Sequence, residues 1–350
     1  MSKGVKTLIA VGTLLASVAI GLADTLTGVT PDITILYLIP IILATVYVGL
    51  AYGLFVSMVA AAAELIFHTQ LGIETGLDLG LDVALHFLVF NLVALLIGRL
   101  IVQLRIIREL EEKRSYDLGI AKDVHKSVFA PFPPSYKNLT IASKVAFARE
   151  LGGDYYHVAT VGDKLFFCIA DISGKSISAA LFSAMLHQNI TEALEHTGNL
   201  TELVARVNAH IYSALSENMF ITLFCCLIDD NGISFVNAGH ETPLLYSRQV
   251  GDIKRLESRM TLPIGIVPDL GIETKTEPFL AGDVLLAFTD GVTDSENFRD
   301  KPYERLEAAL YANSDSNPQD IINIVYQRTI SDNNEIPFDD IVITCIKRRD

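Results

Sequence analysis

Four aspartates in the second half of the chain each adjoin an apolar run, an arrangement that could bring four carboxylates together. They are Asp154 in ELGGDYYHV, Asp171 in FFCIADISGK, Asp290 in LLAFTDGV and Asp339 in PFDDIVIT. An apolar run that meets a carboxylate, often near a glycine, is typical of a buried strand that delivers a ligand to a sheet edge. Carboxylates and water suit Mg²⁺ and Mn²⁺, whereas Zn²⁺ prefers histidine and cysteine. We therefore expect hydrolysis by metal-activated water.

The region around these aspartates alternates between strand and helix patterns. Strand-like runs cover residues 139–144, 155–161, 164–170, 220–228, 233–238, 244–247, 283–288 and 341–346. Helical periodicity covers residues 178–195, 201–216, 303–312 and 318–329. Turn residues join several neighbouring strands, so antiparallel hairpins dominate. Strands in runs and helices in pairs predict an α+β layered sandwich rather than a parallel βαβ sheet.

The first hundred residues are nearly free of charge and account for the high apolar content of the chain, which is 50% hydrophobic. A helix needs about 20 apolar residues to cross a membrane. Four segments approach that length, namely residues 7–23, 33–50, 51–68 and 83–104. The sequence therefore predicts an all-α four-helix transmembrane bundle at residues 1–104. A cleaved signal peptide is the alternative for the first segment.

The flanking charges predict the orientation of this bundle. Lysines precede the first segment, basic residues follow the fourth, and the loops between carry acidic residues without Lys or Arg: Lys3, Lys6, Arg105, Arg108, Lys113, Arg114, Asp24, Asp32, Glu74, Asp78 and Asp82. Positive flanks favour the cytoplasm. We expect a multi-pass protein of the cell's inner (cytoplasmic) membrane, in contact with the lipid bilayer, with both termini cytoplasmic.

Four polar residues lie within the apolar segments: Glu64, His86, Asn91 and Arg99. An ionisable side chain at membrane depth is a candidate functional group. Glu64 and His86 are near the ends of their segments and could reach the interface. Interface or helix-pairing roles are favoured, and ligand sensing, which would make residues 1–104 a sensory domain, is the alternative.

Residues 105–134 form a charged segment with apolar residues at three- and four-residue spacing, as in an amphipathic helix. Prolines at the end of the segment, beginning with Pro131, stop that helix. A coiled coil in a homodimer is favoured over a solvated spacer helix, although residues 114–117 interrupt the apolar stripe. We expect a linker helix that carries signals to residues 135–350.

Charge and cysteine content exclude other classes of function. The net charge is −14 and no basic patch compensates for it, so we expect no nucleic-acid partner. The four cysteines lie in apolar strand-like runs without metal or redox spacing, which indicates reduced core residues: Cys168, Cys225, Cys226 and Cys345.

Six ordered motifs resemble those of PPM-type (type 2C-like) bacterial serine/threonine phosphatases, in the sporulation stage II and stress-sigma regulator branch. They are ARELGGDYYHV, CIADISGKSISAALFSAMLH, VNAGHETPLLY, LPIGI, LLAFTDGVTDSEN and FDDIVIT. The resemblance covers about residues 121–347. It implies a four-layer αββα phosphatase sandwich with two Mn²⁺ or Mg²⁺ ions at one end.

The resemblance also assigns the metal ligands. Asp154 and Asp171 resemble the ligands shared around the metal pair, followed by the backbone carbonyl of Ile172. Asp290 and Asp339 resemble the remaining ligands of one ion. Two cations about 4 Å apart would acidify a bridging water for in-line attack on phosphorus. A structural calcium site is the alternative.

Two positions concern substrate and metal contacts beyond this set. Arg149 lies five residues before Asp154, where more distant relatives place a phosphate-contacting arginine; a structural salt bridge is the alternative. His157 stands where the family usually has Asp, which removes any further metal or water contact expected there.

Other polar residues in the motifs resemble structural groups. Lys175-Ser176 replaces the more usual Lys-Gly before a helix. The motif VNAGHETP favours a role for Asn237 and His240 in hydrogen bonds that stabilise a corner of the chain, rather than in catalysis. Ser173 and Ser178 are typical turn and cap residues.

The sequence thus predicts a membrane-anchored, metal-dependent protein serine/threonine phosphatase. Its expected partner is a phosphorylated cytoplasmic regulatory protein, resembling an anti-anti-sigma factor, in a partner-switching sigma-factor pathway. A membrane receptor whose phosphatase-like domain only binds a partner is the alternative from another class, and a small-molecule phosphoesterase is a further one.

Overall fold

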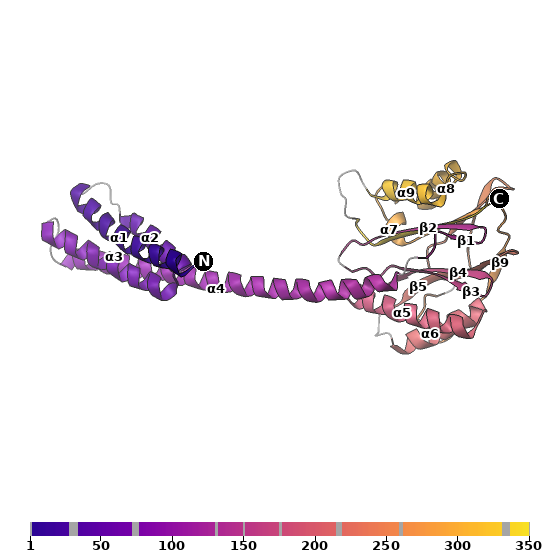
Figure 1. Ribbon diagram of the computed structural model, residues 1–350, viewed down its shortest axis with the longest axis horizontal. Coiled ribbons are helices and arrows are strands. Elements are labelled where there is room, and N and C mark those ends of the chain that lie inside the picture. Colours follow the sequence, from indigo (N-terminus) through magenta and orange to yellow (C-terminus); the bar gives the residue numbers. More distant parts are fainter. Residues whose placement is uncertain are drawn as a thin grey trace. The chain divides into compact units, whose positions relative to one another are not determined.

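The computed structural model describes the chain except residues 1, 28–33, 72–76, 130–131, 150, 175–176, 215–218, 259–261, 331–336 and 350 (Figure 1). The chain divides into two compact units, Met1–Tyr116 and Asp117–Asp350. The division falls within a single helix, α4 (Leu77–Val128). The expected boundary after residue 104 also lies within α4, because the fourth apolar segment and the linker helix are continuous.

The N-terminal unit is helical. Its elements are α1 (Lys3–Thr27), the short 3₁₀ helix η1 (Thr34–Tyr37), α2 (Leu38–Tyr47), α3 (Leu50–Leu71) and the first part of α4. Two helical stretches are long and apolar enough to cross a membrane, Lys3–Ala23 and Gly80–Asp123, and the stretches Thr34–Tyr47 and Leu50–Ile66 are shorter. The expected helical region is therefore present, and four crossings stay a prediction.

Polar side chains join α3 to α4 within this unit. Glu64 Oε1 lies 2.6 Å from His86 Nδ1, and Ser57 Oγ lies 3.1 Å from Asn91 Oδ1. Glu64 is 4% exposed, and the ring of His86 stacks on that of Phe90. The predicted helix-pairing role is confirmed for these residues, since each polar group finds a partner on the neighbouring helix.

The C-terminal unit is a sandwich of two antiparallel sheets. One sheet has the order β1-β2-β11-β10-β7-β8 and the other β3-β4-β5-β6-β9. The strands are β1 (Ser135–Tyr136), β2 (Leu139–Ala146), β3 (Tyr155–Val161), β4 (Lys164–Ile172), β5 (Ile221–Asp229), β6 (Gly232–Ala238), β7 (Leu244–Ser247), β8 (Asp252–Arg255), β9 (Lys275–Glu277), β10 (Val284–Phe288) and β11 (Ile341–Arg348). The second sheet follows the chain order, whereas the first places β11 between β2 and β10 and β7 between β10 and β8, so strands far apart in the sequence lie side by side in it.

Helices cover the outer face of each sheet (Figure 1). They are α5 (Ile177–His196), α6 (Leu200–Ala214), α7 (Asp290–Thr293), α8 (Pro302–Ala312) and α9 (Pro318–Thr329). Three apolar clusters fill the spaces under α5 and α6, between the sheets, and under α8 and α9. The predicted α+β four-layer sandwich is confirmed. The four cysteines are free and buried in these clusters, as expected.

The end of α4 belongs to the C-terminal unit and packs on it. His125 is 4% exposed, and its Nε2 lies 3.1 Å from Ser183 Oγ on α5. Phe129, which follows the helix, contacts the rings of Phe147 and Tyr155. The linker helix thus ends against the segment that leads into β3.

Candidate metal centre

Three of the four predicted aspartates converge at one end of the sandwich. Asp154 immediately precedes β3, Asp171 is the penultimate residue of β4, and Asp290 begins α7 just after β10. One carboxylate oxygen from each lies within 4.8 Å of the others. β3 and β4 belong to one sheet and β10 to the other, so the acidic cluster, defined as these three residues, forms only when the two sheets pack.

Burial and mutual repulsion disfavour the charged form of this cluster. Burial raises the pKa of Asp171 to about 6, and the charge of Asp339 adds to that effect. Burial, then repulsion from Asp171, raises the pKa of Asp290 to about 7. Burial and Asp171 also raise the pKa of Asp154 well above its usual range. Burial and repulsion therefore outweigh any attraction that the described basic residues exert on these three carboxylates.

The other predicted site residues line the same cleft. The acidic cleft has a volume of about 340 Å³, and its walls include Arg149, Ile172, Asp339, Asp171 and Asp290. A Cβ at Gly153 would lie 2.7 Å from the carbonyl oxygen of Ile172. Because Gly153 directly precedes Asp154, this carbonyl oxygen lies beside the backbone that carries one member of the cluster. The ligand roles of these groups stay predictions.

Asp339 and Arg149 lie at the rim of the acidic cleft, where both side chains are exposed. Asp339 is outside the group of three whose oxygens approach within 4.8 Å, and its Oδ1 accepts a hydrogen bond from the backbone N–H of Asp340. Burial raises the pKa of Asp340, and the nearby charge of Arg149 offsets only part of that rise. Neither residue belongs to the acidic cluster, and both line the acidic cleft beside it.

Two residues that the sequence did not single out hold the cluster. Thr289 is fully buried, and its hydroxyl donates to Asp154 Oδ2 at 2.5 Å while accepting from the N–H of Val342 at 2.9 Å. Asp340 accepts hydrogen bonds from the segment before Asp154. Their adjacency to Asp290 and Asp339 in the sequence is the signal that could have identified them.

The structure places His157 away from the acidic cluster. Its ring packs edge-on against His187 at 4.9 Å and lies 6.4 Å from the ring of Tyr155. Burial, then the charge of His187, lowers the pKa of His157 to about 4. It is thus a neutral packing group between β3 and α5. The Lys175-Ser176 departure lies outside the described residues.

Polar residues that could be mistaken for catalysts have structural roles. The Oγ of Ser173 accepts a hydrogen bond from the N–H of Phe220 at 2.7 Å, which ties the end of β4 to the start of β5. The side chain of Asn237 donates to the carbonyl of His240 at 3.0 Å and accepts from its N–H at 2.8 Å. The predicted turn and corner roles are confirmed.

Replacing Asn237 with alanine is expected to lower the free energy of unfolding by about 1–3 kcal/mol, because the backbone groups of His240 lose their buried partners. Urea unfolding measures this loss. The rate constant for hydrolysis at saturating metal should stay near the wild-type value, and a large fall in that rate in a stably folded variant would contradict the corner role.

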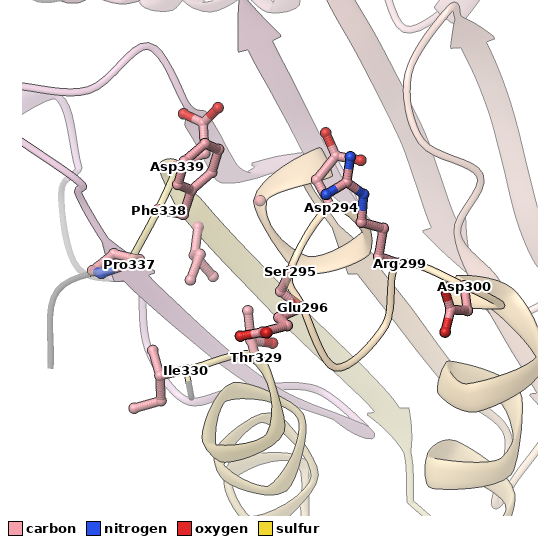
Figure 2. A pocket seen from close by; sticks show the side chains of 12 residues that line it. Asp294, Ser295, Glu296, Arg299, Asp300, Thr329, Ile330, Pro337, Phe338 and Asp339 are labelled. Carbon is pink, nitrogen blue, oxygen red and sulfur yellow. The ribbon is translucent and has the colours of Figure 1, made fainter. Parts of the chain in front are cut away.

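A second hollow adjoins the acidic cleft, with a volume of about 820 Å³. Figure 2 shows Phe338 and Asp339 on one side of it and Asp294 and Arg299 on the other. Phe338 and Asp339 line both spaces, and Phe338 is 95% exposed. The two spaces therefore share the wall formed by Phe338 and Asp339.

The residues of the acidic cluster fit hard divalent cations. Their donors are all carboxylate oxygens, which suit Mg²⁺ and Mn²⁺. Among the described residues that line the cleft, Arg149 alone is basic, and it is exposed. A bound cation would relieve the repulsion that raises the pKa values of Asp171 and Asp290.

The sequence matches those of known proteins. Residues 162–349, more than half of the chain, match the family model of stage II sporulation protein E (SpoIIE). The chain is 25% identical to phosphoserine phosphatase RsbU of Bacillus subtilis over 69% of this chain and 73% of RsbU. It is 29% identical to protein IcfG of Synechocystis over 57% of this chain but only 36% of IcfG.

A solved structure supports the fold. The PP2C domain of SiaA from Pseudomonas aeruginosa superposes with a TM-score of 0.57 at 17% identity, covering 69% of this chain and 99% of that one. At this identity the likeness concerns the arrangement of the sandwich. The acidic cluster is established separately, from the positions of three aspartates in this chain.

Proposed function

This chain belongs to the SpoIIE family, and from that membership and the acidic cluster we propose that it is a metal-dependent protein serine/threonine phosphatase. The observation that carries the proposal is the convergence of Asp154, Asp171 and Asp290 from two sheets on one point. The similarity to the phosphoserine phosphatase RsbU supports phosphoserine as the substrate group.

The residues of the cleft have distinct roles in this reaction. Asp154, Asp171 and Asp290 would hold two Mn²⁺ or Mg²⁺ ions, and Asp339 and the carbonyl of Ile172 would complete the ligands. When bound, the ions supply the positive charge that acidifies a water molecule and offsets the charge of the phosphoryl group.

Side chains around the ligands orient the cluster and the substrate. Thr289 fixes one oxygen of Asp154 through its 2.5 Å hydrogen bond. Arg149, exposed at the rim, contacts the phosphate oxygens of the substrate. The exposed rim of the cleft admits a phosphoserine on a protein surface.

The N-terminal unit anchors the phosphatase in the inner membrane and regulates it. Two helical stretches with membrane-spanning length and composition support an anchor, and four crossings with cytoplasmic termini remain our preferred topology. The end of α4 contacts α5 and the segment before β3. We further propose that α4 pairs with a second copy to form a homodimer.

The physiological substrate we propose is a phosphorylated cytoplasmic regulatory protein of the anti-anti-sigma type. Resemblance to the stress-sigma branch, together with the similarity to RsbU, supports a place in a partner-switching pathway. Retention of all four motif aspartates favours catalysis over a receptor that only binds its partner.

Phosphate release from a phosphoserine-containing protein tests the proposal. The detergent-solubilised full chain should release phosphate only with Mn²⁺ or Mg²⁺, and Asp290→Ala should abolish release. Hydrolysis of a small phosphate ester without any hydrolysis of phosphoproteins would instead identify a small-molecule phosphoesterase. Binding of the phosphoprotein without turnover would identify a receptor.

A further inference from the structure

Asp340 connects the two sheets beside the acidic cluster. It immediately precedes β11 in one sheet, whereas the segment that it binds leads into β3 in the other. Its Oδ1 accepts a hydrogen bond from the N–H of Ala148 at 2.9 Å, and its Oδ2 accepts from the N–H of Gly153 at 2.8 Å. One carboxylate thus holds both ends of residues 148–153.

The surrounding backbone is shaped around this carboxylate. A Cβ at Gly152 would lie 2.5 Å from Asp340 Oδ2 and 2.1 Å from Cδ1 of Phe147. A Cβ at Gly291 would lie 2.0 Å from the carbonyl oxygen of Asp340. Neither position has room for a side chain, so two glycines from separate motifs allow Asp340 to reach the segment.

The segment held by Asp340 carries two groups that matter for the site. Arg149 lies between the two bonded N–H groups, and Asp154 directly follows Gly153. Fixing the ends of the segment therefore fixes where the Arg149 side chain starts and where the Asp154 carboxylate enters the cluster. Thr289, which follows β10 in the opposite sheet, donates a hydrogen bond to Oδ2 of Asp154.

We propose that Asp340 is a positioning residue, distinct from the metal ligands, that sets Asp154 and Arg149 in place through these two backbone hydrogen bonds. The inference rests on the proposed function, because it assigns the residue a role in the same metal-dependent site. Outer partners of metal ligands typically change metal affinity or activity by about 10–100-fold.

Asp283 offers a matched control within the chain. Its Oδ1 accepts from the N–H of Arg248 at 2.8 Å and its Oδ2 from the N–H of Leu280 at 2.7 Å, and it is 1% exposed. It precedes β10, whose other end leads to Asp290. Asp283 therefore makes the same double backbone contact at the opposite end of a strand, away from the cluster.

Calorimetric titration of the full chain with Mn²⁺ tests the assignment, with Asp340→Asn and Asp283→Asn compared. Asparagine keeps one acceptor and turns an N–H group toward the other backbone donor. We expect both variants to lose thermal stability, but only Asp340→Asn to bind Mn²⁺ about 10–100-fold more weakly, with the number of bound ions unchanged. Its KM for a phosphoprotein should also rise.

Two results would overturn the proposal: an equal effect of the two variants on Mn²⁺ affinity, or the loss of one bound ion in Asp340→Asn, which would make Asp340 a ligand. Should the asparagine variant fail to fold, Asp340→Ser leaves space for water at both N–H groups and is measured in the same way. Wild-type protein that binds Mn²⁺ but hydrolyses no phosphoprotein would refute the proposed function, while the calorimetric comparison would still test Asp340.

Discussion

Asp171→Asn is expected to lower the rate of phosphoserine hydrolysis by at least ~100-fold, since even groups that only support a metal ligand contribute about 10–100-fold. The charge of Asp171 acts on both other members of the acidic cluster: after burial, it is the largest contribution that raises the pKa of Asp154 and of Asp290. The amide removes one charged oxygen donor with little change in shape. Phosphate release at several Mn²⁺ concentrations measures the loss.

Asp163→Asn is the control for this substitution. Asp163 lies in the turn between β3 and β4; its side chain is 97% exposed, pairs with Lys137, and is not among the described residues that line the acidic cleft. Its rate should match that of the wild type. Equal rates for Asp171→Asn and the wild type would show that the acidic cluster does not carry the chemistry.

Removal of metal is expected to make the stability of the C-terminal unit fall as the pH rises from 6.5 to 8. The pKa values of Asp171 and Asp290 in the folded chain, about 6 and about 7, exceed the ordinary value of 3.8, so folding favours their protonated forms. Their stabilising effect is complete below pH 3.8 and is lost as the pH rises through 6 and 7. Thermal unfolding in chelator should show this fall.

Buried histidines contribute in a different pH window. Burial lowers the pKa of His157 to about 4 and that of His240 to about 3, from 6.5. The unfolded chain binds protons at these histidines below pH 6.5 while the folded chain does not, so they lower the stability as the pH drops below 6.5. Above pH 6.5 the change of stability with pH therefore comes from the aspartates.

Mn²⁺ should offset the loss, because it binds only the folded cluster. It should therefore raise the melting temperature more at pH 8 than at pH 6.5. Asp290→Asn should increase the metal-free melting temperature at pH 8 and weaken its pH dependence. A metal-free melting temperature that is independent of pH, with no effect of Mn²⁺, would contradict the electrostatic account of the cluster.

The sequence predicted the long apolar strands and the site that they carry. The run at residues 155–161 matches β3, and three of the four motif aspartates converge as expected. These predictions succeed because burial imposes a strong local pattern on strands and because the motifs lie at their ends. Short elements lack such a pattern: α7 has four residues, and β8 and β9 are mostly polar edge strands.

Sequence could not separate the roles of adjacent residues. Asp339 and Asp340 are neighbours of the same type, yet Asp339 is exposed at the rim and Asp340 binds two backbone N–H groups. Thr289 is similarly inconspicuous beside Asp290, although it bonds to Asp154 across the sheets. These contacts depend on how two sheets pack, and no local pattern records that packing.

The apolar pattern also could not show where the predicted membrane-spanning part of α4 ends. Residues 83–104 are apolar and residues 105–128 are amphipathic, but both follow the same helical period, and α4 runs through both. Because the helix continues through this change of composition, no capping residue marks a boundary near residue 104.

Diffraction from Mn²⁺-soaked crystals of the full chain, recorded at the manganese absorption edge, tests the central claim most directly. The account predicts two anomalous peaks about 4 Å apart, bounded by the carboxylates of Asp154, Asp171 and Asp290. Crystals that bind manganese only elsewhere, with no peak among these three carboxylates, would contradict it.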